Sequence, residues 1–96
     1  MTTIDLGKIA TFVRVVETES FTAAAEALGL PKSSVSRSVA RLEEELGVRL
    51  LQRTTRRLGL TEAGAAFYQS VRSALSAVDE AVSAAADLGS EPRGLV

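Results

Sequence analysis

The chain of 96 residues contains no cysteine and no histidine. Without cysteine it can form neither a disulfide nor a thiolate metal site. The absence of cysteine is typical of proteins in a reducing compartment, so we expect a cytoplasmic protein. Without histidine it lacks the commonest general base and the commonest metal ligand. Lys8 and Lys32 are its only lysines, and no nucleophile–base pair can be assembled convincingly. We therefore expect no enzyme activity and no cofactor.

Aromatic residues and long apolar runs are also scarce. Aromatics make up 4% of the chain and hydrophobic residues 46%, so Ala, Leu and Val must form the core, which favours helices over a β-sandwich. No apolar run is long enough to span a membrane, and the first residues lack a signal-peptide pattern. We expect one soluble, intracellular domain with a modest core and no membrane partner.

The net charge of −1 hides an asymmetry along the chain. Between residues 30 and 60, seven Lys and Arg outnumber three Glu, whereas two Arg stand against five acidic residues from 61 to 96. A basic middle beside an acidic end is a local feature of nucleic-acid-binding chains, although a helical domain also scatters its charges for no such reason.

Apolar residues at helical spacing predict two helices before Gly29. The first spans about 4–18, with Thr3 or Asp5 as its cap. The second follows the N-cap Ser20 and ends at Gly29, because the residue after a helix often needs the left-handed backbone that glycine adopts without strain. The residues expected to form their apolar faces are Leu6, Ile9, Phe12, Val13, Val16, Phe21, Ala24, Ala25 and Leu28.

A third helix is expected over 31–46, and its outward face is polar and basic at its leading end. Pro31 opens it, since a first-turn proline loses no helical hydrogen bond, and Gly47 ends it. With Val35 at the centre of the buried face, Ser33 and Arg37 lie nearly opposite at about 100° per residue. The rest of the buried stripe is Val39, Leu42 and Leu46, and the flanking polar residues are Ser34, Ser36 and Arg41.

Two short apolar pieces, 48–51 and 58–60, enclose a basic tip and predict a small β-hairpin. A long helix follows over 61–88, and the residues from 89 onward break its pattern as a linker. Its apolar positions alternate spacings of three and four, as in a coiled coil, and one small core cannot cover them all. We expect this helix to pair with its symmetry mate through Phe67, Val71, Leu75, Val78, Val82 and Leu88.

The second and third helices, joined by a glycine turn, form the arrangement that inserts a helix into the major groove of DNA. Arginine bonds guanine O6 and N7 together, and serine hydroxyls bond bases or phosphates. We expect Ser33, Ser34, Ser36 and Arg37 to contact bases and Arg41 to contact phosphate, with the acidic run 43–45 clear of the groove. The alternative is a solvated polar face whose serines serve helix capping.

The basic hairpin tip suits phosphate contact or insertion into the narrow minor groove. Its candidates are Arg53, Arg56 and Arg57, which could also be an ordinary charged loop tip. Thr61, at the start of the long helix, is a candidate phosphate ligand or a plain N-cap.

Motifs spread over nearly the whole chain carry a family resemblance. They are Phe12-Val13, the run SFTAAA from Ser20 to Ala25, Val35-Ser36-Arg37, Arg41-Leu42-Glu43, Leu46-Gly47, Arg53-Thr54-Thr55-Arg56 and Leu60-Thr61-Glu62-Ala63-Gly64. Taken together they are highly specific, and with them the chain closely resembles the N-terminal part of LysR-type transcriptional regulators.

The resemblance implies a mainly α fold in three parts. These are a winged helix–turn–helix over 1–60 with a three-helix core and a β-hairpin wing, a dimerisation linker helix over 61–88, and a hinge over 89–96 to an absent effector-binding domain. It implies a bacterial, cytoplasmic, nucleoid-associated regulator that binds double-stranded DNA as a homodimer on an inverted-repeat promoter site. It also implies tetramers of the full-length chain and a small-molecule effector bound only by the absent domain.

By position, the resemblance assigns Lys32, Ser33, Ser36 and Arg37 to the groove-facing surface of the recognition helix and Arg56 to the minor groove. Ser20, Thr22 and Arg53 match backbone contacts. Lys32 stands where many members have Gln, and Ser33-Ser34 where Pro or Ala is common, so we expect different preferred bases.

Two alternatives belong to other functional classes. In the first, the chain is an interaction module whose helices only support the coiled-coil seam. The second, an enzyme, is disfavoured by the missing His and Cys. A different winged-helix family would change the name but hardly the mechanism.

Overall fold

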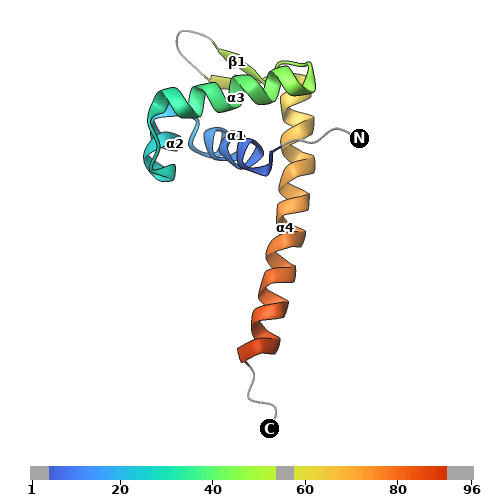
Figure 1. The fold of residues 1–96 in the computed structure, drawn as a ribbon. Helices are drawn as coiled ribbons and strands as arrows, with labels where there is room; N and C mark the ends of the chain where they lie inside the picture. The colour runs from blue at the N-terminus through green and yellow to red at the C-terminus, as the bar shows by residue number, and fades with distance from the viewer. Residues whose placement is uncertain (1–4, 54–57, 91–96) are drawn as a thin grey trace.

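The computed structural model describes residues 5–53 and 58–90, apart from the side chains of Arg53 and Ser90. Along the chain lie α1 (Leu6–Thr18), α2 (Phe21–Leu28), α3 (Lys32–Leu46), β1 (Leu51–Arg53), β2 (Leu58–Leu60) and α4 (Glu62–Ser90). Helices α1 to α3 form one body with the hairpin beside it, and α4 extends away from that body (Figure 1). None of the described helices combines the length and apolarity that a membrane crossing requires. The mainly helical fold with a hairpin and a long final helix is confirmed.

The core lies where α1, α2 and α3 meet the start of the hairpin. Its largest fully buried side chains are Phe12, Val15, Val35, Val39, Leu42, Leu50 and Leu51. The ring of Phe12 also contacts α4, with centroids 5.6 Å from Phe67 and 6.5 Å from Tyr68. One aromatic residue of α1 therefore links the three-helix body to the long helix.

The helix boundaries follow local signals in the sequence. The carboxylate of Asp5 accepts the Gly7 N–H at 2.8 Å, and the Ser20 hydroxyl accepts the Ala23 N–H at 3.0 Å. Gly29 and Gly47 end α2 and α3 with φ of 68° and 74°, the left-handed region that favours glycine. The caps Asp5 and Ser20 and both glycine stops are confirmed; Thr3 lies outside the described residues.

The apolar face of α1 differs from the expected one at two positions. Leu6 is 76% exposed, whereas Val15 is fully buried. At about 100° per residue, Leu6 lies about 120° from Phe12 and Val15 about 60° from it, so a face centred on Phe12 includes Val15 and leaves Leu6 at its edge. The expectation that Leu6 belongs to the core is wrong.

Three expected boundaries also shift. Helix α3 begins at Lys32, and Pro31 precedes it as N-cap with an extended ψ of 147°, not as a first-turn residue. Strand β1 begins at Leu51, three residues later than expected, and pairs antiparallel with β2 in the register Leu51↔Leu60. Helix α4 continues through Gly89 to Ser90. An interior glycine costs a helix only about 1 kcal/mol and does not by itself end it.

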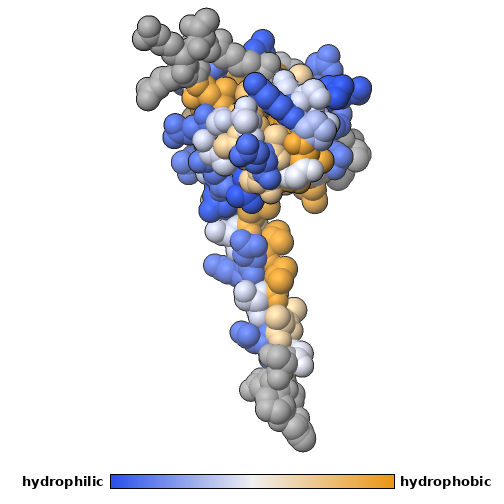
Figure 2. Space-filling view, turned by 90° about the vertical axis from the view of Figure 1, so that its left-hand side faces the viewer, coloured by the Kyte–Doolittle hydropathy of each residue, from blue (hydrophilic) through white to orange (hydrophobic). Residues whose placement is uncertain are grey.

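The two halves of α4 differ in their surroundings. Phe67, Val71 and Leu75 pack against the chain's own core, and Val71 is only 9% exposed. Val78, Val82 and Leu88 are 55%, 61% and 66% exposed, and apolar surface follows the shaft of α4 beyond the body (Figure 2). The residues expected to face a second helix thus fall into two groups. The first three pack against the core of this chain, and the last three are exposed to solvent.

Candidate nucleic-acid interface

The leading half of α3 presents a polar face away from the core. Val35 and Val39 are fully buried, and Lys32, Ser33, Arg37 and Arg41 are exposed. Ser34 and Ser36 are half-buried on the two flanks, as expected. Ser33, Arg37 and Arg41 thus lie on the side of α3 opposite the core, with Ser34 and Ser36 at its flanks and Lys32 exposed in the first turn.

The serines of α3 do not cap it. The N-cap is Pro31, which has no side-chain cap, and the Ser34 N–H donates to the Pro31 carbonyl at 3.0 Å. Ser33 and Ser34 therefore lie inside the first turn. Capping, the ordinary explanation for serines at a helix start, does not account for them here.

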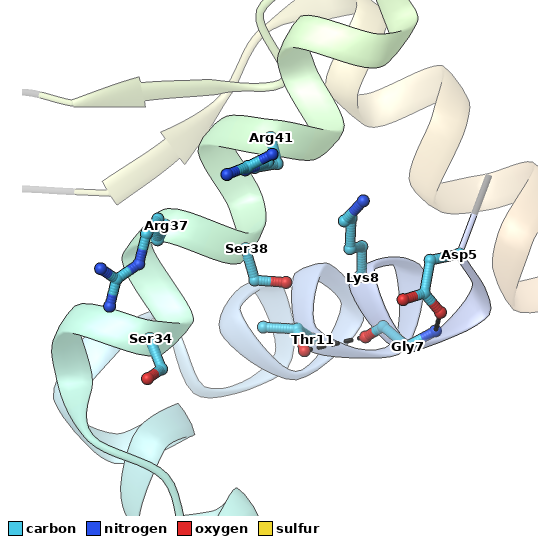
Figure 3. A pocket seen from close by; sticks show the side chains of 8 residues that line it. All are labelled: Asp5, Gly7, Lys8, Thr11, Ser34, Arg37, Ser38 and Arg41. Carbon is cyan, nitrogen blue, oxygen red and sulfur yellow. Dashed lines mark hydrogen bonds between the residues drawn. The ribbon is translucent and has the colours of Figure 1, made fainter.

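A shallow pocket of about 380 Å³ lies between α1 and this flank of α3. Figure 3 shows Arg37 and Arg41 along α3, with Lys8 and Thr11 on α1 and Ser38 between them. The residues that line it are Asp5, Gly7, Lys8, Thr11, Ser34, Arg37, Ser38 and Arg41. Lys8 and Ser38 were not predicted as neighbours of this surface, because no local feature of the sequence shows that α1 crosses α3 here.

The cations of the described residues fall into two groups. Lys8, Arg14, Arg49 and Arg72 each lie within 4.0 Å of a glutamate carboxylate. In the described part of the chain, none of the three exposed cations of α3 has such a partner: Lys32, Arg37 and Arg41. Among the described residues, cations without a carboxylate partner therefore lie only on α3, although the net charge of the chain is −1.

Two hydroxyl candidates lie at the N-terminus of α2. Ser20 is half-buried and its oxygen accepts the Ala23 N–H, so it acts as a cap, while Thr22 is exposed on the first turn. Both positions remain predicted contacts of the DNA backbone.

The hairpin candidates are only partly described. The backbone of Arg53 pairs with Leu58 in the ladder, but its side chain lies outside the described residues, as do Arg56 and Arg57. Thr61 is described: its hydroxyl donates to the Arg49 carbonyl at 2.6 Å and accepts the Gly64 N–H at 2.9 Å. These two bonds favour the N-cap role for Thr61, and phosphate contact there stays a prediction.

Glu43 has a role that sequence analysis did not anticipate. It was expected to lie clear of the groove with its acidic neighbours, yet it is only 7% exposed. Its Oε2 accepts the N–H groups of Leu50 and Leu51 at 2.8 and 3.1 Å. At 100° per residue Glu43 lies about 80° from Val35, at the edge of the buried face. This angle was the one feature of the sequence that indicated the burial of Glu43.

Comparisons with known proteins agree on one family. The profile described as "Bacterial regulatory helix-turn-helix protein, lysR family" matches residues 6–65. An HTH-type transcriptional regulator of Xanthomonas campestris pv. campestris (strain 8004) is 54% identical over 92 residues, which are 96% of this chain and 27% of that protein. The regulator PtxR of Pseudomonas aeruginosa is 47% identical over 91 residues, 95% of this chain and 29% of that one. The chain thus spans less than a third of the length of these relatives.

Solved structures show the same fold bound to DNA. The BenM_DBD/benA site 1 DNA complex aligns with a TM-score of 0.83 at 41% identity, covering 91% of this chain and 98% of that one. Full-length BenM aligns with a TM-score of 0.77 at 44% identity, covering 83% of this chain and 26% of that one. The matched relatives are regulators of transcription, in agreement with the expectation that the chain is not an enzyme.

Proposed function

Because the chain belongs to the LysR family of bacterial helix-turn-helix regulators and is its DNA-binding part, we propose that α3 enters the major groove of a specific site. Lys32, Ser33, Ser34, Ser36 and Arg37 then face base edges. The observation that carries this proposal is the set of unpaired cations on α3, beside four described cations that are paired elsewhere.

Arg37 is the strongest candidate for base recognition. It lies opposite the buried Val35 and is exposed, and no described carboxylate holds its guanidinium. A bidentate arginine–guanine pair discriminates against a wrong base by about 1–3 kcal/mol. The three serines add shorter hydrogen-bonding groups that can reach bases or phosphates.

Phosphate contacts would orient the helix without selecting sequence. Arg41 lies one turn after Arg37 on the same exposed side, and Thr22 is exposed at the start of α2. We add Ser20 and Arg53 on the basis of the family resemblance. On the same basis we place Arg56 and Arg57 of the wing in the minor groove.

Pairing of two chains is proposed from α4. Val78, Val82 and Leu88 leave an apolar stripe exposed on a helix of 29 residues, and a monomer gains nothing from that exposure. Two copies joined along this stripe would present two α3 helices to an inverted repeat.

The two relatives extend well beyond the part that this chain matches. We propose that a longer protein continues from residues 89–96 into an effector-binding domain, assembles as a tetramer and acts on promoters in the bacterial cytoplasm. The 27% and 29% shares of the two relatives support such a continuation.

The test is a mobility shift on sites that the wild-type chain selects from random duplex DNA. Arg37→Ala should weaken binding to the selected site by about 10- to 100-fold and leave binding to unrelated DNA nearly unchanged, because one bidentate base contact is worth about 1–3 kcal/mol. Wild-type affinity should also fall steeply as salt rises, since phosphate contacts release counterions.

The matched control is Arg72→Ala, which removes an arginine of α4 that already pairs with Glu17 of α1. Equal losses from Arg37→Ala and Arg72→Ala would rule out the groove assignment. A stable dimer with salt-independent, negligible DNA binding would instead favour the interaction module, for which the exposed α4 stripe is the supporting feature.

A further inference from the structure

Residues 49–51, the approach to the hairpin, are held on one side by α3. The Glu43 side chain is 8% exposed, and its Oε2 accepts the N–H groups of Leu50 and Leu51. The guanidinium of Arg49 lies 3.6 Å from the same oxygen. A buried carboxylate is stable only with such donors around it, so these contacts fix segment 49–51 against the last turns of α3.

The same segment is held on its other side by the start of α4. The Leu50 carbonyl accepts the Thr61 N–H at 3.0 Å, and the Arg49 carbonyl accepts the Thr61 hydroxyl at 2.6 Å. Thr61 in turn caps the first turn of α4 through the Gly64 N–H. Residues 49–51 therefore connect the two helices through hydrogen bonds on both sides.

Because Gly64 has no side chain, the start of α4 lies close against the backbone of Leu50. A Cβ added at Gly64 would lie 1.9 Å from the Leu50 carbonyl oxygen and 2.8 Å from its carbon. Real Cβ atoms do not approach a backbone oxygen so closely, so any other residue here requires α4 and segment 49–51 to move apart. The contrast with Gly59, where an added Cβ meets nothing within 4 Å, shows that this restriction is local.

A small rotation at the start of α4, where it contacts segment 49–51, moves the far end of this long helix by several ångströms. At 1.5 Å per residue, a helix of 29 residues is about 44 Å long, so a rotation of about 5° at its start moves its end by about 4 Å. One base pair advances about 3.4 Å along DNA. A rotation of about 5° at the junction thus displaces the far end of α4, where two chains would pair, by about the rise of one base pair.

We propose that Glu43, segment 49–51, Thr61 and Gly64 form a junction that sets the spacing between the two half-sites. The junction acts as a positioning element: it fixes the direction of α4 relative to α3, and pairing through α4 converts this direction into a distance between recognition helices. The proposal rests on the paired binding proposed above. It places part of the site specificity at residues that touch no base.

The test measures affinity for a series of inverted repeats whose half-sites are separated by successive single base pairs, and for one isolated half-site. Two junction variants are used, Gly64→Ala and Glu43→Gln. Their controls are Gly59→Ala, which has room for the methyl group, and Glu44→Gln, an exposed neighbour. Circular dichroism confirms that each variant is folded.

Junction variants should bind the half-site within about twofold of wild type. At the wild-type spacing they should lose about tenfold or more, with the optimum displaced or flattened, because bivalent binding gains 10²- to 10⁴-fold only when the geometry matches. The controls should keep the wild-type profile. If Gly64→Ala does not fold, Glu43→Gln decides, since a neutral amide oxygen accepts the two N–H groups more weakly and no longer attracts the Arg49 guanidinium, which loosens segment 49–51 without leaving its N–H groups unpaired.

A second measurement needs no DNA. The chain lacks cysteine, so Glu26→Cys on the exposed side of α2 gives one spin-label site per protomer. The distance between labels in the dimer should shift or broaden in the junction variants and not in the controls.

The outcomes separate the two proposals. Folded junction variants that keep both the wild-type spacing optimum and the label distance overturn the junction and leave paired DNA binding intact. A wild-type chain that binds all spacings as it binds the half-site overturns paired binding, and the junction proposal with it.

Discussion

The two ends of α3 carry opposite charges and use them in opposite directions. At the leading end, Lys32, Arg37 and Arg41 point outward and have no carboxylate partner among the described residues. At the trailing end, Glu43 is buried against the hairpin and Glu45 accepts from Lys8 of α1 at 2.9 Å. One helix thus combines an open binding surface with a closed scaffold.

The difference shows that charge sign alone is a poor guide to a site. Both ends are rich in charge, but two of the three carboxylates at the acidic end, those of Glu43 and Glu45, have partners within the chain, whereas the cations Lys32, Arg37 and Arg41 have no carboxylate partner among the described residues. An unpaired cation is available to a phosphate or a base without first breaking an internal ion pair. Substitutions at the leading end should therefore change DNA affinity directly, and those at the trailing end should act through the stability and geometry of the scaffold.

The largest effect is expected from Glu43→Ala. It leaves the buried N–H groups of Leu50 and Leu51 without their acceptor, which should lower the free energy of unfolding by about 2–4 kcal/mol. Thermal unfolding followed by circular dichroism measures this loss of stability. Glu44→Ala, at an exposed position, is the control and should be nearly neutral. Equal melting temperatures for the two variants would contradict the scaffold role of the trailing end.

A smaller effect, on affinity alone, is expected from Arg41→Ala. Loss of one phosphate contact should weaken binding to selected and unrelated DNA alike and reduce the slope of log affinity against log salt by about 1. Arg14→Ala removes a paired arginine of α1 and serves as the control. A change in melting temperature without a change in salt slope would place Arg41 in the scaffold instead.

The smallest effect is expected from Glu45→Gln. The Lys8–Glu45 pair is part-exposed, with side chains 23% and 36% accessible, so its loss should cost less than about 1 kcal/mol of stability. It also leaves Lys8 unpaired at the rim of the α1–α3 pocket, which should raise DNA affinity slightly at low salt. A loss of affinity would show that the pair, rather than free cations, orders this side of α3.

The elements and their order were predictable because their signals are local. Ser20 caps α2, and Gly29 and Gly47 adopt the left-handed backbone that ends a helix. Each of these features depends only on residues a few positions away in the sequence. The outward surface of α3 followed from helical periodicity around Val35. For the same reason, Ser33, Arg37 and Arg41 were placed on the exposed side without any knowledge of the fold.

The misplaced residues share a different cause. Leu6 was assigned to the core because it is apolar and helically spaced, but the face of α1 is centred on Phe12, whose neighbours come from α4. Phe67 and Val71 were expected in a seam with a second chain and pack against the core of their own chain, and their part in that seam stays a prediction. Periodicity shows that a face is apolar and does not show what covers it.

Local chemistry thus established the helices, their boundaries, the polar surface of α3 and the family resemblance, because caps, glycines and spacing act over less than two turns. Packing between distant segments assigned the partners: Lys8 to Glu45, Phe12 to Phe67, and Glu43 to the backbone of Leu50 and Leu51. Such contacts depend on where whole helices cross. The same acidic run could equally have been solvated, and burial turned one of its three members into the link between α3 and the hairpin.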